Sequence, residues 1–256
     1  MALNTVCGLC HNRSMSKSEH SELDRAACVA DLKRFLYEAR DLRLAAAADP
    51  VRGRRREYLR AWQAARLAET HADLLASPKF GVAAKFFLSD LYGPKDFSER
   101  DTEMEKVLPI MTTMLPVSGL RTLLLAVEVD ALSERFDADM VAALGPQLDQ
   151  EVDKGSLSLT AYAVAYCQVG NPAGRQLQIR LIGETGEALD ALAHKTFARG
   201  ALKLMHRPAQ MAGLGELHAF LERGFEAFRS LRQAHEFLDI VVEREATLMK
   251  SLFSSV

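Results

Sequence analysis

The strongest evidence for the architecture is the stretch at residues 216–250, ELHAFLERGFEAFRSLRQAHEFLDIVVEREATLMK. Its large apolar side chains recur every three or four residues, as they do on one face of a helix. They are Leu217, Leu221, Phe225, Phe228, Leu231, Leu238, Val242 and Met249, and His235 shares their face. The spacing predicts one helix of roughly 35 residues, about 50 Å long at a rise of 1.5 Å per residue. Because so long an apolar face needs long neighbours, we expect a bundle of helices.

The rest of the chain supports the same fold class. Glycine and proline, which interrupt helices, number only 15 and 8 in 256 residues. No segment alternates apolar and polar residues as a half-buried strand does. The predicted helices end at the breakers Pro50, Pro78, Gly93 and Pro116. We therefore predict an all-α bundle of roughly eight or nine helices with a long C-terminal amphipathic helix.

Local signals place the other helices. An apolar stripe at residues 32–44 ends before Asp49, and a second helix from about 52 to 77 forms an antiparallel hairpin with it. A third helix covers residues 79–92. The fourth begins at a capping box of Asp96 and Glu99 and reaches about residue 115, with a bend or break at Pro109. The fifth covers residues 118–136, and a short sixth begins at Asp137 or Asp139.

The second half gives clearer starts. Residues 158–169 contain a seventh helix, and Asn171 followed by Pro172 is the start signal of an eighth that extends toward His194. Gly183 and Gly186 within it allow close packing. We expect one domain at residues 21–256, with a sub-bundle junction near 147–156, after a flexible polar tail at residues 1–20. Because Met15 resembles a translation start, residues 1–14 could lie outside the native protein.

Charge and hydropathy exclude several classes of protein. The chain carries 32 Lys and Arg against 34 Asp and Glu, a net charge of −2. A general nucleic-acid binder needs a basic excess, so we expect no nucleic-acid partner. No apolar run reaches the roughly 20 residues that cross a bilayer, and no basic and apolar leader precedes Cys7. We therefore expect a cytoplasmic protein without a membrane span.

Cysteines near the N-terminus offer a weak metal candidate. Cys7, Cys10 and His11 form the C-x-x-C-H pattern of covalent haem attachment. The same ligands could hold zinc together with His20 or Cys28. There is no second C-x-x-C pair, no export signal and no Glu-x-x-His pair of the di-iron type. We therefore favour a tail without metal and expect no cofactor.

Two ionisable residues interrupt apolar faces. Glu128 lies one turn from Leu124 and Leu132, so it needs a basic partner such as Arg121 or has a raised pKa. His235 lies between Leu231 and Leu238 on the last helix. We favour a hydrogen-bonded core histidine, with a haem ligand or buried proton acceptor as the alternative.

The densest positive patch consists of Arg52, Arg54, Arg55, Arg56 and Arg60. Phosphate, an acidic partner or anionic lipid could bind such a patch. However, Glu57 lies inside it, and Glu38, Asp41 and Asp49 are expected across the hairpin. We therefore favour a solvated face of salt bridges.

Residues 86–92 read Phe-Phe-Leu-Ser-Asp-Leu-Tyr. The segment resembles the signature of a bacterial family named for the motif Phe-Phe-Leu-Glu-Glu-Leu-Tyr, with Ser89 and Asp90 in place of the two glutamates. Residues 93–101, 207–209, 212–214, 220–225 and 244–245 are also similar to that family, and the resemblance covers residues 32–253. It implies a single helical domain in the bacterial cytosol. It supplies no catalytic residue, because the family has no assigned activity.

Physical chemistry favours a structural role for this motif. Phe86, Phe87 and Leu88 cannot share one helical face, so the segment is expected to be wedged between neighbours. A carboxylate near a helix C-terminus is disfavoured by the helix dipole, so Asp90 needs Lys95, Arg100 or a function. We favour a segment that holds the third and fourth helices together over a ligand site.

No Walker loop, G-x-G-x-x-G turn or G-x-S-x-G elbow is present, so the sequence does not support catalysis. The leading hypothesis is a non-enzymatic protein-interaction or regulatory module that binds an unidentified protein or a second copy of itself. The alternative is a small-ligand-binding protein or enzyme with a pocket near residues 86–92, Glu128 and His235. The candidate ligand or interaction residues are Phe86, Phe87, Asp90, Tyr92, Asp96, Arg100, Asp101, Glu128 and His235.

Overall fold

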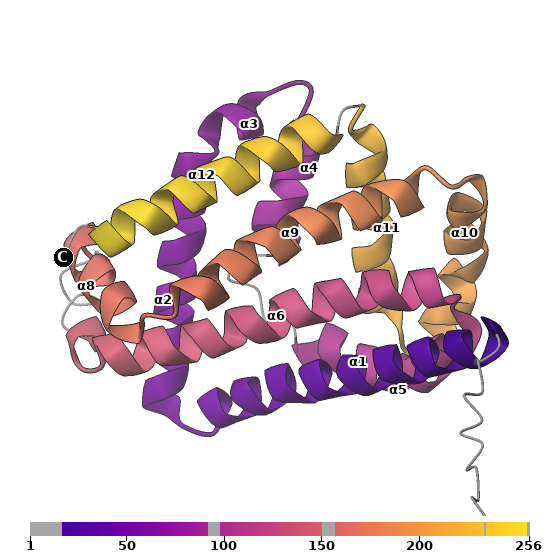
Figure 1. The fold of residues 1–256 in the computed structure, drawn as a ribbon, viewed down its shortest axis with the longest axis horizontal. Coiled ribbons are helices and arrows are strands. Elements are labelled where there is room, and N and C mark those ends of the chain that lie inside the picture. The colour runs from indigo at the N-terminus through magenta and orange to yellow at the C-terminus, as the bar shows by residue number, and fades with distance from the viewer. Residues whose placement is uncertain (1–16, 92–97, 150–156, 233, 255–256) are drawn as a thin grey trace, which may run out of the picture.

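The computed structural model describes residues 17–91, 98–149, 157–232 and 234–254. Within these residues all twelve regular segments are helices, one of them a π-helix, and no strand occurs (Figure 1). The predicted all-α class is therefore confirmed. The helix number exceeds eight or nine chiefly because predicted helices are divided at His71, at residue 87 and after Ser230.

Eight helices are long: α1 (Lys17–Ala47), α2 (Pro50–Thr70), α5 (Ser98–Met114), α6 (Val117–Leu144), α9 (Pro172–Ala193), α10 (Thr196–Met211), α11 (Gly215–Ser230) and α12 (Ala234–Ser254). The shorter segments are α3 (Ala72–Ala76), α4 (Gly81–Phe86), the π-helix η1 (Phe87–Leu91) and α8 (Leu159–Val169). The predicted flexible tail lies mostly outside the described residues, and α1 begins at Lys17, four residues before the predicted domain start. Residues 150–156 of the predicted junction also lie outside the described part of the chain.

Local caps explain the helix starts that the sequence predicted. The Asp49 carboxylate accepts hydrogen bonds from the backbone N–H groups of Val51 and Arg52, and Pro50 occupies the first turn of α2. The Asn171 side chain accepts from Gly174 N at 2.9 Å, and Pro172 follows as the first residue of α9. These contacts lie within one turn of the chain, which is why short sequence patterns identify them.

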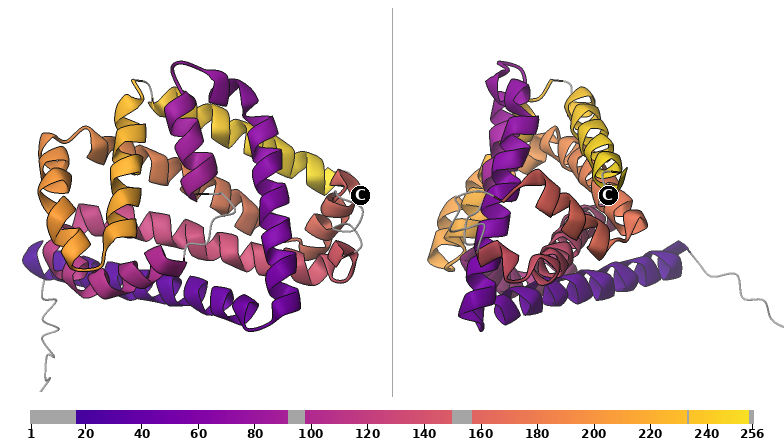
Figure 2. Two further views of the ribbon diagram at one scale, coloured as in Figure 1. Left: turned by 180° about the vertical axis from the view of Figure 1, so that it is seen from behind. Right: turned by 90° about the vertical axis from the view of Figure 1, so that its left-hand side faces the viewer.

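The long helices form two crossing layers (Figures 1 and 2). In one layer α6 lies between α1 and α9, and α12 packs beside α9. Behind this layer α2, α4 and α11 cross it steeply, and α10 lies at one edge against α11. The predicted antiparallel hairpin of the first two helices is wrong, because α1 packs along α6 whereas α2 turns away at Pro50. The apolar faces of α1 and α2 enter different clusters, around Leu32 and Leu59.

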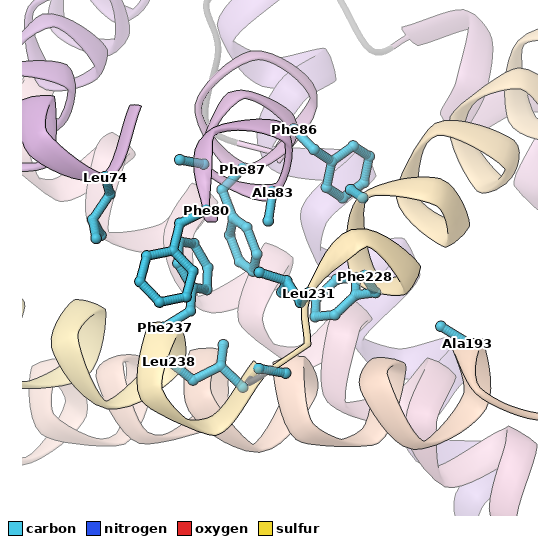
Figure 3. Packing of buried hydrophobic residues seen from close by; sticks show 13 residues of the cluster. Leu74, Phe80, Ala83, Phe86, Phe87, Ala193, Phe228, Leu231, Phe237 and Leu238 are labelled. Atoms are coloured by element: carbon cyan, nitrogen blue, oxygen red, sulfur yellow. The ribbon is translucent and has the colours of Figure 1, made fainter. Parts of the chain in front are cut away.

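The predicted 35-residue C-terminal helix is also wrong. It is two helices, because α11 ends at Ser230, Leu231 has an extended backbone at φ −76° and ψ 115°, and α12 begins at Ala234. Leu231 is buried at the bend. The break lets α11 cross behind α9 while α12 runs beside it, so the apolar faces of both reach one core, shown in Figure 3.

Two other predicted interruptions do not occur. The fifth and sixth helices are one helix, α6, because Phe136, Met140 and Leu144 continue its buried stripe past Asp137. Pro109 lies inside α5 without ending it, and the Thr113 hydroxyl donates to Pro109 O at 2.9 Å. Both differences show packing overriding a local stop signal.

Close packing at Gly186 confirms the role predicted for that glycine. A Cβ atom there would overlap Leu238 of α12, so only glycine allows α9 and α12 to approach so closely. Gly183, one turn earlier, faces Val242 with only 3.1 Å between that atom position and Val242 Cγ2.

Candidate functional site

The motif at residues 86–92 begins at the end of α4 and continues into η1. Phe86 and Phe87 are buried, and their rings contact three aromatic residues of α11 and α12. Figure 3 shows Phe87 with Phe228 and Phe237. Phe86 lies 5.6 Å from Phe220, and Phe87 lies 5.7 Å from Phe228 and 5.5 Å from Phe237, between ring centroids. These rings fill the core between the two layers.

Gly224 brings α11 unusually close to the motif. A Cβ atom at this position would lie 2.9 Å from Cζ of Phe86, closer than side chains tolerate. The residues on either side belong to the stretch at 220–225 that also resembles the motif family. The two resembling stretches are therefore in contact with each other in the fold.

Asp90 makes a second connection between η1 and α11. Its side chain is only 7% exposed, and Arg223 Nε lies 2.8 Å from Asp90 Oδ1. The adjacent Ser89 hydroxyl donates to Asp90 Oδ2 at 2.7 Å. The sequence had suggested Lys95 or Arg100 as the partner, and Arg223 of α11 is a cation that it had not suggested. The motif joins α4 and η1 to α11 and α12.

Four of the predicted site residues cannot be placed as side chains. Tyr92 and Asp96 lie outside the described residues, together with Lys95 of the predicted pairing. Arg100 and Asp101 lie on the first turn of α5, but their side chains fall outside the described part. The same holds for Cys7, Cys10 and His11 of the metal candidate. Among the described residues, no group of three His, Cys, Asp or Glu side chains could hold a metal ion.

The surroundings of Glu128 differ from those of the motif residues, and so do those of His235. Burial raises the pKa of the Glu128 carboxyl, and the nearest charges come from α1 and α9, including Arg34. The suggested partner Arg121 pairs with Asp24 at 3.1 Å instead.

The predicted core position of His235 is wrong, because its side chain is 78% exposed and pairs with Asp239 at 3.2 Å. Because of the bend after Ser230, a different side of the C-terminal helix faces the core. Phe237 and Leu238 therefore point into the core.

The arginine run divides between the interior and the surface. Arg56 and Arg60 contact the carboxylate of Glu134, which is 3% exposed on α6, at 2.6 and 2.8 Å. Arg43 of α1 joins the same carboxylate at 3.2 Å. These cations hold the pKa of Glu134 below its usual value despite its burial. The prediction of a solvated salt-bridged face is therefore wrong for this part, because a buried acid of α6 attracts the inner side of α2.

Further polar groups continue inward from this cluster. Burial raises the pKa of Asp137 to about 6, and the Gln63 amide lies 3.4 Å from the Tyr162 hydroxyl. Arg66 Nη1 donates to both oxygens of Glu245 at 2.9 Å, and His71 Nε2 lies 3.2 Å from the same carboxylate. These contacts join α2 to α6, α8 and α12. Arg66 and Glu245 form an ion pair between α2 and α12.

Sequence reasoning missed the outer face of α10. The chain has no acid between residues 191 and 215, and a basic row recurs at every fourth residue there: Lys195, Arg199, Lys203 and Arg207. All four are exposed, and no ion pair is recorded for them among the described residues. Beside this basic row lies an apolar row of Leu204, Pro208 and Met211. Leu204 is 78% exposed and Met211 is 90% exposed. The charge pattern was visible in the sequence, but the exposure of the apolar row was not.

The opposite side of α10 holds the helix to its neighbour. Ala209 is buried, and the His206 ring lies 5.4 Å from the ring of His218 on α11. Lys203, Leu204, Arg207 and Met211 lie on the side of the helix opposite to Ala209, and this side faces away from the molecule. We call these four residues the α10 outer face. The helix itself lies at the edge of the structure (Figures 1 and 2).

The described residues thus define an all-helical protein with structural ion pairs inside and an apolar, basic helix face outside. Residues 42–256 match the model of a family described as a domain of unknown function (DUF8198), and the chain belongs to that family. No curated protein and no solved structure matched the chain. In the described part of the chain, no helix is both long and apolar enough to cross a membrane.

Proposed function

We propose that the protein is a non-enzymatic interaction module and that the α10 outer face is its docking surface. One observation carries the proposal: Leu204 and Met211, two large apolar side chains, project into solvent beside the basic row. Exposed apolar groups cost free energy in water, and exposed cations without acids attract an anionic partner. A surface that combines both is typical of an interaction site.

The buried acids support a role other than catalysis. Glu134 and Glu245 are tied to arginines of α2, and Asp90 is tied to Arg223 of α11. Glu103 of α5 accepts a hydrogen bond from Leu217 N at 2.7 Å at the start of α11. Each of these carboxylates fastens one helix to another. The proposal therefore assigns the interior to stability and the α10 outer face to recognition.

Photocrosslinking tests this function without assuming the partner. A photoreactive amino acid replaces Leu204 in the full chain, and in a matched control it replaces Leu44, which is 59% exposed on α1. We expect crosslinks in cells at position 204, either to lipid or to a protein, and none at position 44. Lys203→Glu with Arg207→Glu should abolish them. Equal crosslinking at both positions, or none at position 204, would contradict the proposed function.

We also propose where the protein acts and to which family it is related. We place the module in the bacterial cytoplasm, where the membrane surface and many proteins carry negative charge. A protein partner or a second copy of the chain, as the sequence suggested, is the alternative occupant of the α10 outer face. We also propose kinship with the Phe-Phe-Leu-Glu-Glu-Leu-Tyr family. The contact between residues 86–90 and residues 220–224 supports it, since both stretches carry the resemblance.

A further inference from the structure

We infer that the α10 outer face binds an anionic membrane surface, with α10 lying parallel to the bilayer. This inference rests on the proposed function, because it names the occupant of the same docking surface.

The apolar row has the shape that a fluid bilayer accommodates. Leu204 and Met211 are exposed on α10, which lies at the edge of the molecule (Figure 1). A folded partner would need a groove matched to both side chains, whereas lipid chains rearrange around them. The exposed side chains of α10 combine aliphatic residues with lysine and arginine, the combination of helices that lie in the membrane interface.

Two cations of the basic row are placed to reach headgroups at the same time. Lys203 and Arg207 lie one turn apart, about 6 Å along the helix axis, and share a face of α10 with Leu204 and Met211. One flat surface can therefore contact all four side chains. Each Lys or Arg close to an anionic leaflet contributes about 1 kcal/mol. The long side chains of Lys203 and Arg207 can keep their charges at headgroup level while Leu204 enters the apolar region.

The distribution of charge favours one orientation of the protein as it approaches the membrane. The chain has a net charge of −2, and the basic row supplies four positive charges. The remaining chain therefore carries a net charge of about −6. An anionic surface repels most of the molecule and attracts α10, so the protein meets the membrane with this helix first.

Vesicle sedimentation tests the inference with the full-length protein. The probes are vesicles of phosphatidylcholine alone and vesicles that also contain phosphatidylserine, each at low and high salt. We expect binding only to the anionic vesicles and weaker binding at high salt, because salt screens the attraction. Lys203→Glu with Arg207→Glu should lower the affinity at least tenfold. Leu204→Ser with Met211→Ser should lower it severalfold at unchanged salt dependence.

Matched variants control for charge and for exposed apolar area. Arg52→Glu with Arg54→Glu makes the same charge change on exposed residues of α2, and Leu44→Ser removes an exposed leucine of α1. Both should bind anionic vesicles as the unmodified protein does, and circular dichroism shows whether each variant is folded. Absence of binding, equal binding to neutral vesicles, or equal losses in the controls would overturn the inference. If the protein does not bind anionic vesicles while position 204 still crosslinks to a protein, the membrane inference is wrong and the proposed function is retained.

Discussion

Arg223 Nε lies 2.8 Å from Asp90 Oδ1, and this pair joins the π-helix η1 to α11 across 133 positions of sequence. The carboxylate is buried and Arg223 is half exposed, so the pair lies at the rim of the aromatic cluster. Together with the ring contacts of Phe86 and Phe87, the pair holds the end of α4 and η1 against α11.

Gly224→Ala should destabilise the protein by about 1–3 kcal/mol, because the added methyl group overlaps Phe86 in a packed core. Gly200→Ala in α10 is the matched control. Nothing lies within 4 Å of its added methyl group, so this change should stabilise the helix by up to about 1 kcal/mol. Chemical denaturation measures both free energies of unfolding. A Gly224→Ala protein as stable as the unmodified one would contradict the close approach of α11 to the motif.

Glu134→Gln should be among the most damaging conservative changes, at about 3–5 kcal/mol. It removes the shared negative charge between Arg43, Arg56 and Arg60 without changing the size of the side chain. Asp41→Asn breaks a pair with Arg40 whose acid is 65% exposed, and should leave the melting temperature unchanged. Similar melting temperatures for the two variants would show that the buried cluster does not hold α1 and α2 to α6.

Asp137 should make stability depend on pH. Its pKa rises from 3.8 to about 6 on folding, so the folded state binds the proton more tightly than the unfolded state. Its contribution is fully present below pH 3.8 and is lost as pH rises through about 6. Between pH 5 and pH 7 the free energy of unfolding should fall by about 1 kcal/mol more in the unmodified protein than in Asp137→Asn. Parallel pH profiles for the two proteins would argue against burial of this carboxyl group.

Truncation of His71 should destabilise the protein far more than truncation of His235. His71 is buried against Glu245, so His71→Ala should cost about 2 kcal/mol or more. His235 is largely exposed, and His235→Ala should change stability by less than about 0.5 kcal/mol. Thermal unfolding of the two variants measures both changes in stability. A large loss from His235→Ala would restore the core position suggested by the sequence.

Features set by a few neighbouring residues could be predicted. Asn171 caps α9 through a hydrogen bond that spans three residues, and its cap was predicted from the sequence. Asp49 and Ser158 cap α2 and α8 in the same local way, although the sequence analysis had not predicted them as caps. The break after Ser230 was not, because no glycine or proline marks it. It exists because Leu231 is buried where α11 and α12 meet, and that depends on how α9 lies in the fold.

The site was less predictable than the fold for the same reason. Arg56 and Arg60 face inward because their acceptor Glu134 lies on α6, more than 70 positions away. A run of arginines in the sequence does not reveal that distant partner. The basic row of α10 was readable, since its spacing is regular. Its apolar row became recognisable only when packing on α11 showed which half of α10 faces solvent.

The α10 outer face is tested most directly by an environment-sensitive fluorescent amino acid placed at position 204, and at position 44 for comparison. Both proteins are titrated with anionic vesicles. The account predicts a blue shift of the emission at position 204 as its surroundings become apolar, and no shift at position 44. An unchanged spectrum at position 204 while the protein is bound, or the same shift at both positions, would contradict docking through this face.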